Sequence, residues 1–219
     1  MSPPKLAGPG VELSQIASLD TGRGTVLGFR CAEAQMRDLS LDRTHLHTGR
    51  VTGLHTARTY FSGVRAESVA FEDCSLGTLE WSKGKIARSV FRGCKLMGAT
   101  FDDVTADHLL FENCRLDFAA FNRLRTAGRV VFSGCVLTEA TFAGCDLRHA
   151  VFDGCTLRQT EFDDGYYRGC DLRDNDLSGV RGVHRLEGVV INSSQQFQLT
   201  EALVSSLQVT FGDAESHRR

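Results

Sequence analysis

The feature that most constrains the fold is a five-residue repeat of bulky apolar residues. In the stretch FAGCDLRHAVFDGCTLRQTEF, from Phe142 to Phe162, phenylalanine returns every ten residues and leucine lies halfway between. The same spacing extends over roughly residues 26 to 182, with one slip of register in FNRLRTAGRVVF. A period of five fits neither the 3.6-residue helix nor the two-residue strand. The chain is therefore predicted to turn a corner after each five-residue unit.

A column of cysteines defines a second, longer period. Five of the eight cysteines form one column, each two positions before a repeat leucine, at intervals of 20, 20, 21 and 20 residues. They are Cys74, Cys94, Cys114, Cys135 and Cys155. Four units therefore make one turn, and because a single unit cannot bury its apolar side alone, the turns must stack. The pattern predicts an all-β solenoid of square cross-section, a quadrilateral β-helix of about seven to eight coils.

Two columns of aromatic residues are predicted to fill the axis of this solenoid with stacked rings. One column consists of Phe71, Phe91, Phe111, Phe132 and Phe152. The column on the opposite side contains Phe101, Phe121, Phe142 and Phe162, preceded by Phe61 and Trp81. The inward-facing cysteines are predicted to be free thiols, because parallel strands hold their Cβ atoms about 4.8 Å apart, wider than a disulfide prefers.

Catalytic and metal-binding patterns are sparse. We find no nucleophile elbow and no phosphate-binding loop, so we expect no enzyme activity, no catalytic residue and no cofactor. His45 and His47 flank the inward Leu46, and we interpret them as surface histidines rather than metal ligands. No run of eighteen apolar residues predicts a membrane span, and no signal-peptide pattern opens the chain. These observations favour a cytoplasmic protein.

The repeat resembles that of the pentapeptide-repeat proteins, which implies a right-handed quadrilateral β-helix. The later segments GCDL, DLSGV, LEGVVI and QQFQL are similar to the end of the quinolone-resistance members of that family. Those proteins resemble duplex DNA in shape, bind DNA gyrase and topoisomerase IV, and form dimers through their C-terminal ends. The resemblance implies a homodimer that protects gyrase from topoisomerase poisons and binds no nucleic acid itself. One departure is the absence of projecting loops, since only one residue is inserted here, near Arg123–Arg129.

The expected domain organisation follows from where the repeat starts and stops. We expect a flexible N-terminus over residues 1–10, the β-helix over 11–182, a strand and helix over 183–211, and a flexible tail over 212–219. Ser193 or Ser194 is expected to cap the helix. Leu199, Ala202, Leu203 and Leu207 are predicted to share one face of it. This face would cover the last coil and form the dimer contact.

Charge is segregated by face, although 25 basic and 27 acidic residues leave a net charge of only −2. The two aromatic faces each carry six acids against two basic residues, so they are the predicted partner-binding surface. The residues proposed for contact are Glu72, Asp73, Asp102, Asp103, Glu112 and Asp153. A stretch of duplex DNA as long as six coils carries about 17 phosphates. The acids on the two aromatic faces are fewer than that, so the charge mimicry is partial. An interaction scaffold with an unrelated protein partner remains the alternative.

Overall fold

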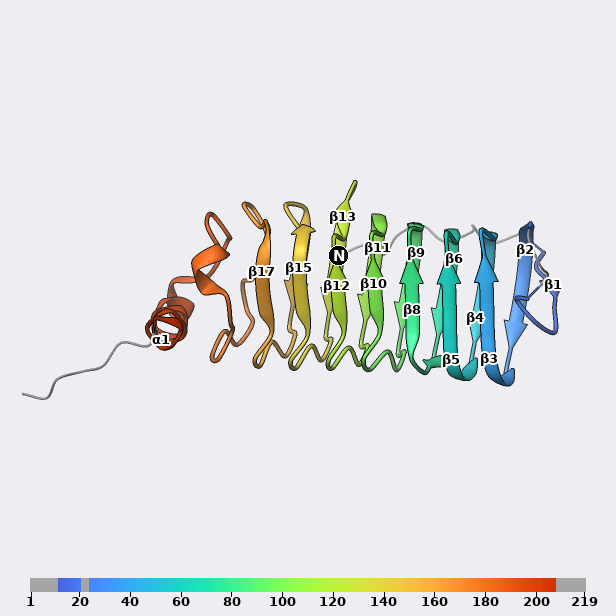
Figure 1. The fold of residues 1–219 in the computed structure, drawn as a ribbon, viewed down its shortest axis with the longest axis horizontal. Coiled ribbons are helices and arrows are strands. Elements are labelled where there is room, and N and C mark those ends of the chain that lie inside the picture. The colour runs from blue at the N-terminus through green and yellow to red at the C-terminus, as the bar shows by residue number, and fades with distance from the viewer. Residues whose placement is uncertain (1–11, 21–23, 208–219) are drawn as a thin grey trace, which may run out of the picture.

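The protein is a rod made of stacked turns of parallel strand. The computed structural model describes residues 12–20 and 24–207, and Figure 1 shows the strands side by side from β1 and β2 at one end to α1 at the other. The solenoid has about seven turns and a single short C-terminal helix, which confirms the predicted fold class. The predicted flexible segments 1–10 and 212–219 lie outside the described residues.

Most strands are short, and many of them bend around one corner of the square. The strands are β1 (Ser14–Gln15), β2 (Thr25–Ala32), β3 (Gln35–Asp42), β4 (His45–Thr52), β5 (His55–Ser62), β6 (Arg65–Glu72), β7 (Ser75–Leu76), β8 (Leu79–Ser82), β9 (Lys85–Arg92), β10 (Thr100–Asp102), β11 (Thr105–Glu112), β12 (Ala120–Asn122), β13 (Arg125–Thr126), β14 (Val130–Ser133), β15 (Thr141–Asp146), β16 (Ala150–Asp153) and β17 (Glu161–Tyr166). The helical elements are η1 (Val183–Arg185), η2 (Ser193–Gln195) and α1 (Gln196–Ser206).

The strand register confirms four five-residue sides per turn. Phe71 pairs with Phe91, and Phe91 pairs with Phe111, each at an interval of 20 residues. The interval becomes 21 on the corner that follows Thr126, because Ala106 still pairs with Thr126 whereas Leu109 pairs with Val130. The extra residue therefore lies between Thr126 and Val130, within the stretch where the sequence slips.

The predicted tight corners before the cysteines are present. Asp73, Gly93, Asn113, Gly134 and Gly154 all have φ between 52° and 62°. This left-handed conformation suits Gly, Asn and Asp better than other residues. The composition of these positions is therefore explained by the turn that each one makes.

The two aromatic columns fill the axis as predicted, and every ring in the predicted set is buried. Within a column the phenylalanine rings stack in parallel, with centroids 5.0 Å apart for both Phe91–Phe111 and Phe111–Phe132. Across the axis the rings meet edge to face, as Phe111 and Phe121 do at 79°. Both arrangements are favourable for aromatic pairs. The core is thus one continuous stack of rings from turn to turn.

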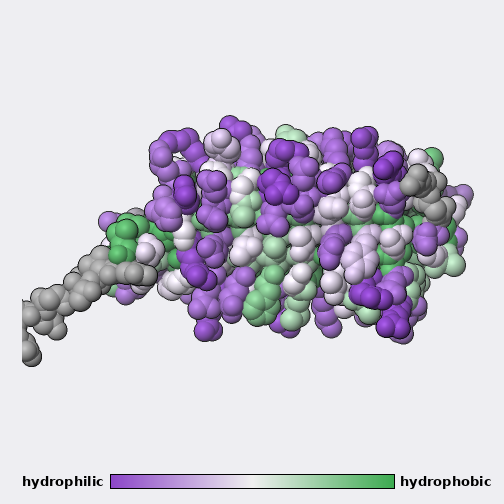
Figure 2. All heavy atoms as spheres, viewed as in Figure 1, coloured by the Kyte–Doolittle hydropathy of each residue, from purple (hydrophilic) through white to green (hydrophobic). Residues whose placement is uncertain are grey.

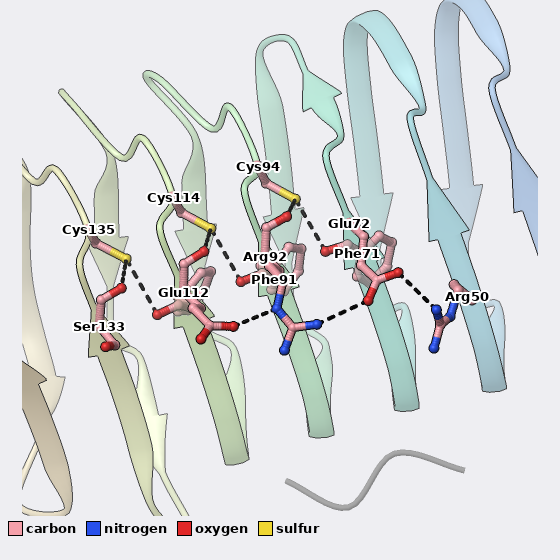
Figure 3. A network of polar contacts seen from close by, with 11 residues as sticks. Arg50, Phe71, Glu72, Phe91, Arg92, Cys94, Glu112, Cys114, Ser133 and Cys135 are labelled. Atoms are coloured by element: carbon pink, nitrogen blue, oxygen red, sulfur yellow. Dashed lines mark hydrogen bonds and ion pairs between the residues drawn. The ribbon is translucent and has the colours of Figure 1, made fainter. Parts of the chain in front are cut away.

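The cysteine column is also confirmed, and all eight cysteines are free and buried. Each thiol of the column donates to a carbonyl oxygen of the preceding turn, as Cys94 does to Phe71 at 3.4 Å and Cys114 to Phe91 at 3.3 Å (Figure 3). The adjacent Cys114 thiol and burial raise the pKa of Cys94 to about 12. At neutral pH this thiol is therefore protonated and acts as a structural donor rather than a nucleophile.

Amide side chains replace cysteine where the column ends. Asn175 lies 20 residues after Cys155, and Gln195 lies 20 residues after Asn175. The Asn175 side chain accepts from the Cys155 backbone N–H at 2.7 Å and donates to the Phe152 carbonyl at 2.9 Å. The Gln195 side chain donates to the Asn175 carbonyl at 2.7 Å. Both amides are buried and satisfy backbone groups that an open last turn would leave unpaired.

The start of the C-terminal helical segment differs from the sequence prediction. Ser193 and Ser194 already belong to η2, and the capping residue is Asn192, which is extended. The Gln195 side chain accepts a hydrogen bond from the Asn192 backbone N–H at 2.7 Å, which forms one half of a capping box. Asn192 was overlooked because two serines follow it, and serine is an equally good capping residue.

Candidate functional site

The predicted partner-binding acids lie on the outside of the rod, where the five-residue register places them. Glu72 and Glu112 follow the inward Phe71 and Phe111 at the ends of β6 and β11. Asp102 and Asp103 follow the inward Phe101 at the end of β10. Glu72 and Glu112 therefore stand on the same face two turns apart, with Arg92 on the turn between them.

Arginines on neighbouring turns bind two of these acids in a ladder of ion pairs. Arg50 contacts Glu72 at 3.3 Å, Arg92 contacts Glu72 at 3.2 Å, and Arg92 contacts Glu112 at 2.5 Å. Figure 3 shows the four side chains in line across successive strands. Glu112 raises the pKa of Arg92, as expected for a direct ion pair. The ladder ties four successive turns together, but it leaves less unpaired negative charge on this face.

The second pair of predicted acids is also neutralised by arginine. Asp102 forms an ion pair with Arg123, and Asp103 forms one with Arg125 at 2.7 Å. Both carboxylates are about one-third exposed, so a partner can reach them, although it meets an Asp–Arg pair rather than an isolated acid.

Asp73 and Asp153 complete the predicted set and are both exposed. Asp153 accepts a hydrogen bond from the Ser133 hydroxyl at 3.5 Å. Among the residues that the structure describes, neither acid forms an ion pair. These two carboxylates are therefore the part of the Phe71 face with uncompensated negative charge.

Sequence reasoning missed the arginine partners because it summed charges over each face. The signal was available in the register: Glu72, Arg92 and Glu112 are 20 residues apart, and residues at this interval are neighbours on successive turns. Opposite charges that face each other across adjacent strands attract one another. A charge count made column by column would have found this ladder.

The predicted apolar face of α1 is divided between two environments. Ala202 is buried, and Leu199 packs against the core from a partly buried position. Leu203 and Leu207 are 36% and 62% exposed, and Phe197, which the prediction did not include, is 70% exposed. Figure 2 shows hydrophobic atoms gathered at the α1 end of a mostly hydrophilic rod. One side of the helix covers the last turn, and the other presents an apolar patch to solvent.

The surface histidines have a carboxylate partner rather than a metal-binding arrangement. The Nε2 atoms of His45 and His47 lie 3.7 and 3.8 Å from the carboxylate oxygens of Glu67. Within residues 12–20 and 24–207, no group of three or more His, Cys, Asp or Glu side chains is arranged to hold a metal ion. In the same residues no helix is long and apolar enough to cross a membrane.

Comparison with known proteins identifies the repeat. Residues 110–181 match the family model described as a pentapeptide repeat region. No curated protein sequence matches the chain significantly.

Solved structures with related repeats share little sequence with the chain. A trypsin-treated variant of QnrB1, a plasmid-mediated fluoroquinolone resistance protein, is 16% identical over 87% of this chain and 100% of its own, with a TM-score of 0.41. HetL, a pentapeptide repeat protein involved in heterocyst differentiation regulation in the cyanobacterium Nostoc, is also 16% identical. That match covers 78% of this chain and 89% of HetL, with a TM-score of 0.37.

Proposed function

We propose that this pentapeptide-repeat protein is a non-enzymatic binding protein that occupies the DNA-binding surface of a type II topoisomerase and protects the enzyme from poisons. The observation that carries the proposal is the rod itself, which presents outward carboxylates on several of its turns around a solid aromatic core. Such a rod offers a long convex surface that suits contact with another macromolecule better than it suits catalysis. The similarity of its C-terminal segment to quinolone-resistance proteins supports the choice of DNA gyrase or topoisomerase IV as partner.

Encounter with a basic DNA-binding surface depends on carboxylates that a partner can reach. Asp73 and Asp153 are free of ion pairs in the described part of the chain, and Asp102 and Asp103 are held by exchangeable surface pairs. Exposed ion pairs of this kind are worth only about 0–1 kcal/mol. A basic partner can therefore replace the arginines, and the complex is expected to weaken as salt concentration rises.

Replacing Asp102 and Asp103 together by asparagine is expected to weaken protection of gyrase by about five- to tenfold while the fold is retained. The double change frees Arg123 and Arg125, so this part of the rod becomes cationic and repels a basic surface. The measurement is gyrase supercoiling and drug-stabilised DNA cleavage with a fluoroquinolone, with and without the protein.

The matched control is Glu139→Gln, which removes one acid at an exposed corner of a different side. This variant is expected to protect as well as the unchanged protein. If the unchanged protein neither inhibits supercoiling nor lowers cleavage at micromolar concentration, across several gyrase poisons, the topoisomerase proposal is wrong. If the unchanged protein protects gyrase and the Asp102/Asp103 double variant protects it equally well, the proposal stands and these two residues are not contacts.

A second candidate function is an interaction scaffold with an unrelated protein partner. This alternative is favoured by the ion pairs that arginines form with Glu72, Glu112, Asp102 and Asp103. Because these pairs neutralise the acids, the surface of the rod resembles a polyanion less closely. Capture of the same host protein by the unchanged rod and by a gyrase-inactive variant would support this alternative.

We also propose that the protein forms a homodimer through the exposed side of α1. Phe197, Leu203 and Leu207 together present the largest exposed apolar groups of this helix, and exposed apolar patches rimmed by polar residues mark interaction surfaces. Leu203 and Leu207 are one helical turn apart, so they act as one patch. A second copy presents the same patch and can cover it symmetrically.

Changing Leu203 and Leu207 to glutamate is expected to convert the dimer to a monomer, because two charges cannot be buried without partners. Light scattering after size-exclusion chromatography would measure the mass. Glu201→Lys is the control, since it changes the charge of the same helix outside the patch. An unchanged dimer in the Leu203/Leu207 variant would place the interface elsewhere.

A further inference from the structure

A row of ionisable side chains follows the corner at which the extra residue is inserted. The strand register aligns Ser89, Leu109, Val130 and Ala150 on four successive turns. The residues immediately before them therefore stack along the same corner. They are Arg88, His108, Arg129 and His149. Arg88 forms an ion pair with Glu67. The other three side chains lie beside the inserted residue.

The same three side chains line a depression in the surface of about 490 Å³. Its remaining wall is formed by small or apolar residues, including Ala127, Gly128 and Val151, and by Asp171. A Cβ atom at Gly128 would collide with the carboxylate of Asp107 and with the ring of His108. With glycine at this position, the inserted segment lies against Asp107 and His108 without displacing their side chains. The depression is open to solvent and has an apolar part beside a cationic part.

The carboxylates near this depression are already engaged within the protein. Asp107 forms a hydrogen bond with Nδ1 of His108 at 2.7 Å. Asp171 accepts two hydrogen bonds from Arg173 at 2.9 and 2.7 Å, and Arg173, with a smaller effect from Arg129, holds the pKa of Asp171 below its usual value. Among the residues that the structure describes, the Arg129 and His149 side chains make no direct hydrogen bond or ion pair, although the charge of Arg129 acts on Asp171. Their donors point to a ligand with acceptor oxygens.

We infer that this depression binds a small phosphomonoester. The planar guanidinium of Arg129 matches the paired oxygens of a phosphate group, and the imidazoles on the turns before and after it add further donors. Ala127 and Val151 provide an apolar surface for the organic group that the phosphate carries. A bare phosphate ion would leave this part of the depression unused. The site is separate from the acids and from the α1 patch on which the proposed function depends.

Adenosine monophosphate is a suitable probe, with orthophosphate titrated in parallel. NMR of the histidine ring signals of the intact protein would report the binding. We expect the His108 and His149 signals to shift with adenosine monophosphate while those of His45 and His47 remain in place. Orthophosphate is expected to bind more weakly, because it makes no contact with Ala127 and Val151.

Arg129→Gln is expected to weaken the binding of adenosine monophosphate by about tenfold, since it removes charge-assisted hydrogen bonds from an exposed position that the fold does not need. Arg158→Gln removes another exposed arginine, on a different side of the rod, and is expected to change nothing. The inference is overturned if millimolar adenosine monophosphate leaves the His108 and His149 signals unchanged. It is also overturned if Arg129→Gln binds normally, or if orthophosphate binds as tightly as the nucleotide.

Discussion

Replacing Phe111 with alanine is expected to lower the free energy of unfolding by about 3–5 kcal/mol, the usual cost of deleting a buried aromatic side chain. The Phe111 ring is buried, stacks between Phe91 and Phe132, and meets Phe101 and Phe121 edge to face. Its neighbours are locked in their own stacks, so the cavity cannot close. Chemical denaturation followed by circular dichroism would measure the loss.

Glu112→Gln is the matched control, because the residue follows Phe111 directly but faces outward. It loses an exposed ion pair with Arg92, which is expected to cost less than about 1 kcal/mol. Similar losses at Phe111 and Glu112 would contradict the alternation of inward and outward side chains on which the solenoid rests. The same experiment also tests whether the turns unfold together, since a repeat protein can lose its turns in steps.

Replacing Asn175 with alanine is expected to cost about 2–3 kcal/mol, because several buried backbone groups lose their partners at once. The backbone N–H of Cys155 and the carbonyl of Phe152 both depend on this side chain. Thermal unfolding and hydrogen exchange at Cys155 would measure the effect. We expect amide protection to be lost first over the turns next to α1.

Asn175→Cys is the informative comparison, since cysteine occupies this column in the preceding turns. A thiol can donate to the Phe152 carbonyl, as the earlier cysteines do one turn back, but it is a poor acceptor for the Cys155 N–H. The variant is therefore expected to recover part of the stability. Full recovery would show that the amide is not required at the end of the column.

The fold could be predicted from the sequence because one constraint is repeated many times. Each phenylalanine and each cysteine fixes the register of its own turn, so single exceptions such as Trp81 or the slip after Thr126 do not hide the pattern. The closing segment has no such repetition. Gln195 continues the cysteine column by position. Its role depends on which backbone groups of the last turn lack a hydrogen-bond partner, and only the three-dimensional structure shows these groups.

The candidate site was predicted less completely, for a different physical reason. The position of each acid relative to the core follows from the five-residue period, and Glu72 and Asp102 lie outward as expected. Their electrostatic environment depends on side chains one turn away, such as Arg92 and Arg123. The division of the α1 face likewise depends on the angle at which the helix meets the last turn, which periodicity does not specify.

The extra residue between Thr126 and Val130 shows where this architecture tolerates a change in chain length. Phe132 still stacks on Phe111 at 5.0 Å, and Phe152 stacks on Phe132 at 4.7 Å, so the turns that follow are undisturbed. The extra residue lies at a corner of the turn, where no aromatic ring has to move to make room for it. This corner is thus a natural graft point: a peptide epitope, a sensor or a longer loop inserted here would be displayed on the rod without redesign of its interior, in place of the depression that Gly128 and Arg129 line.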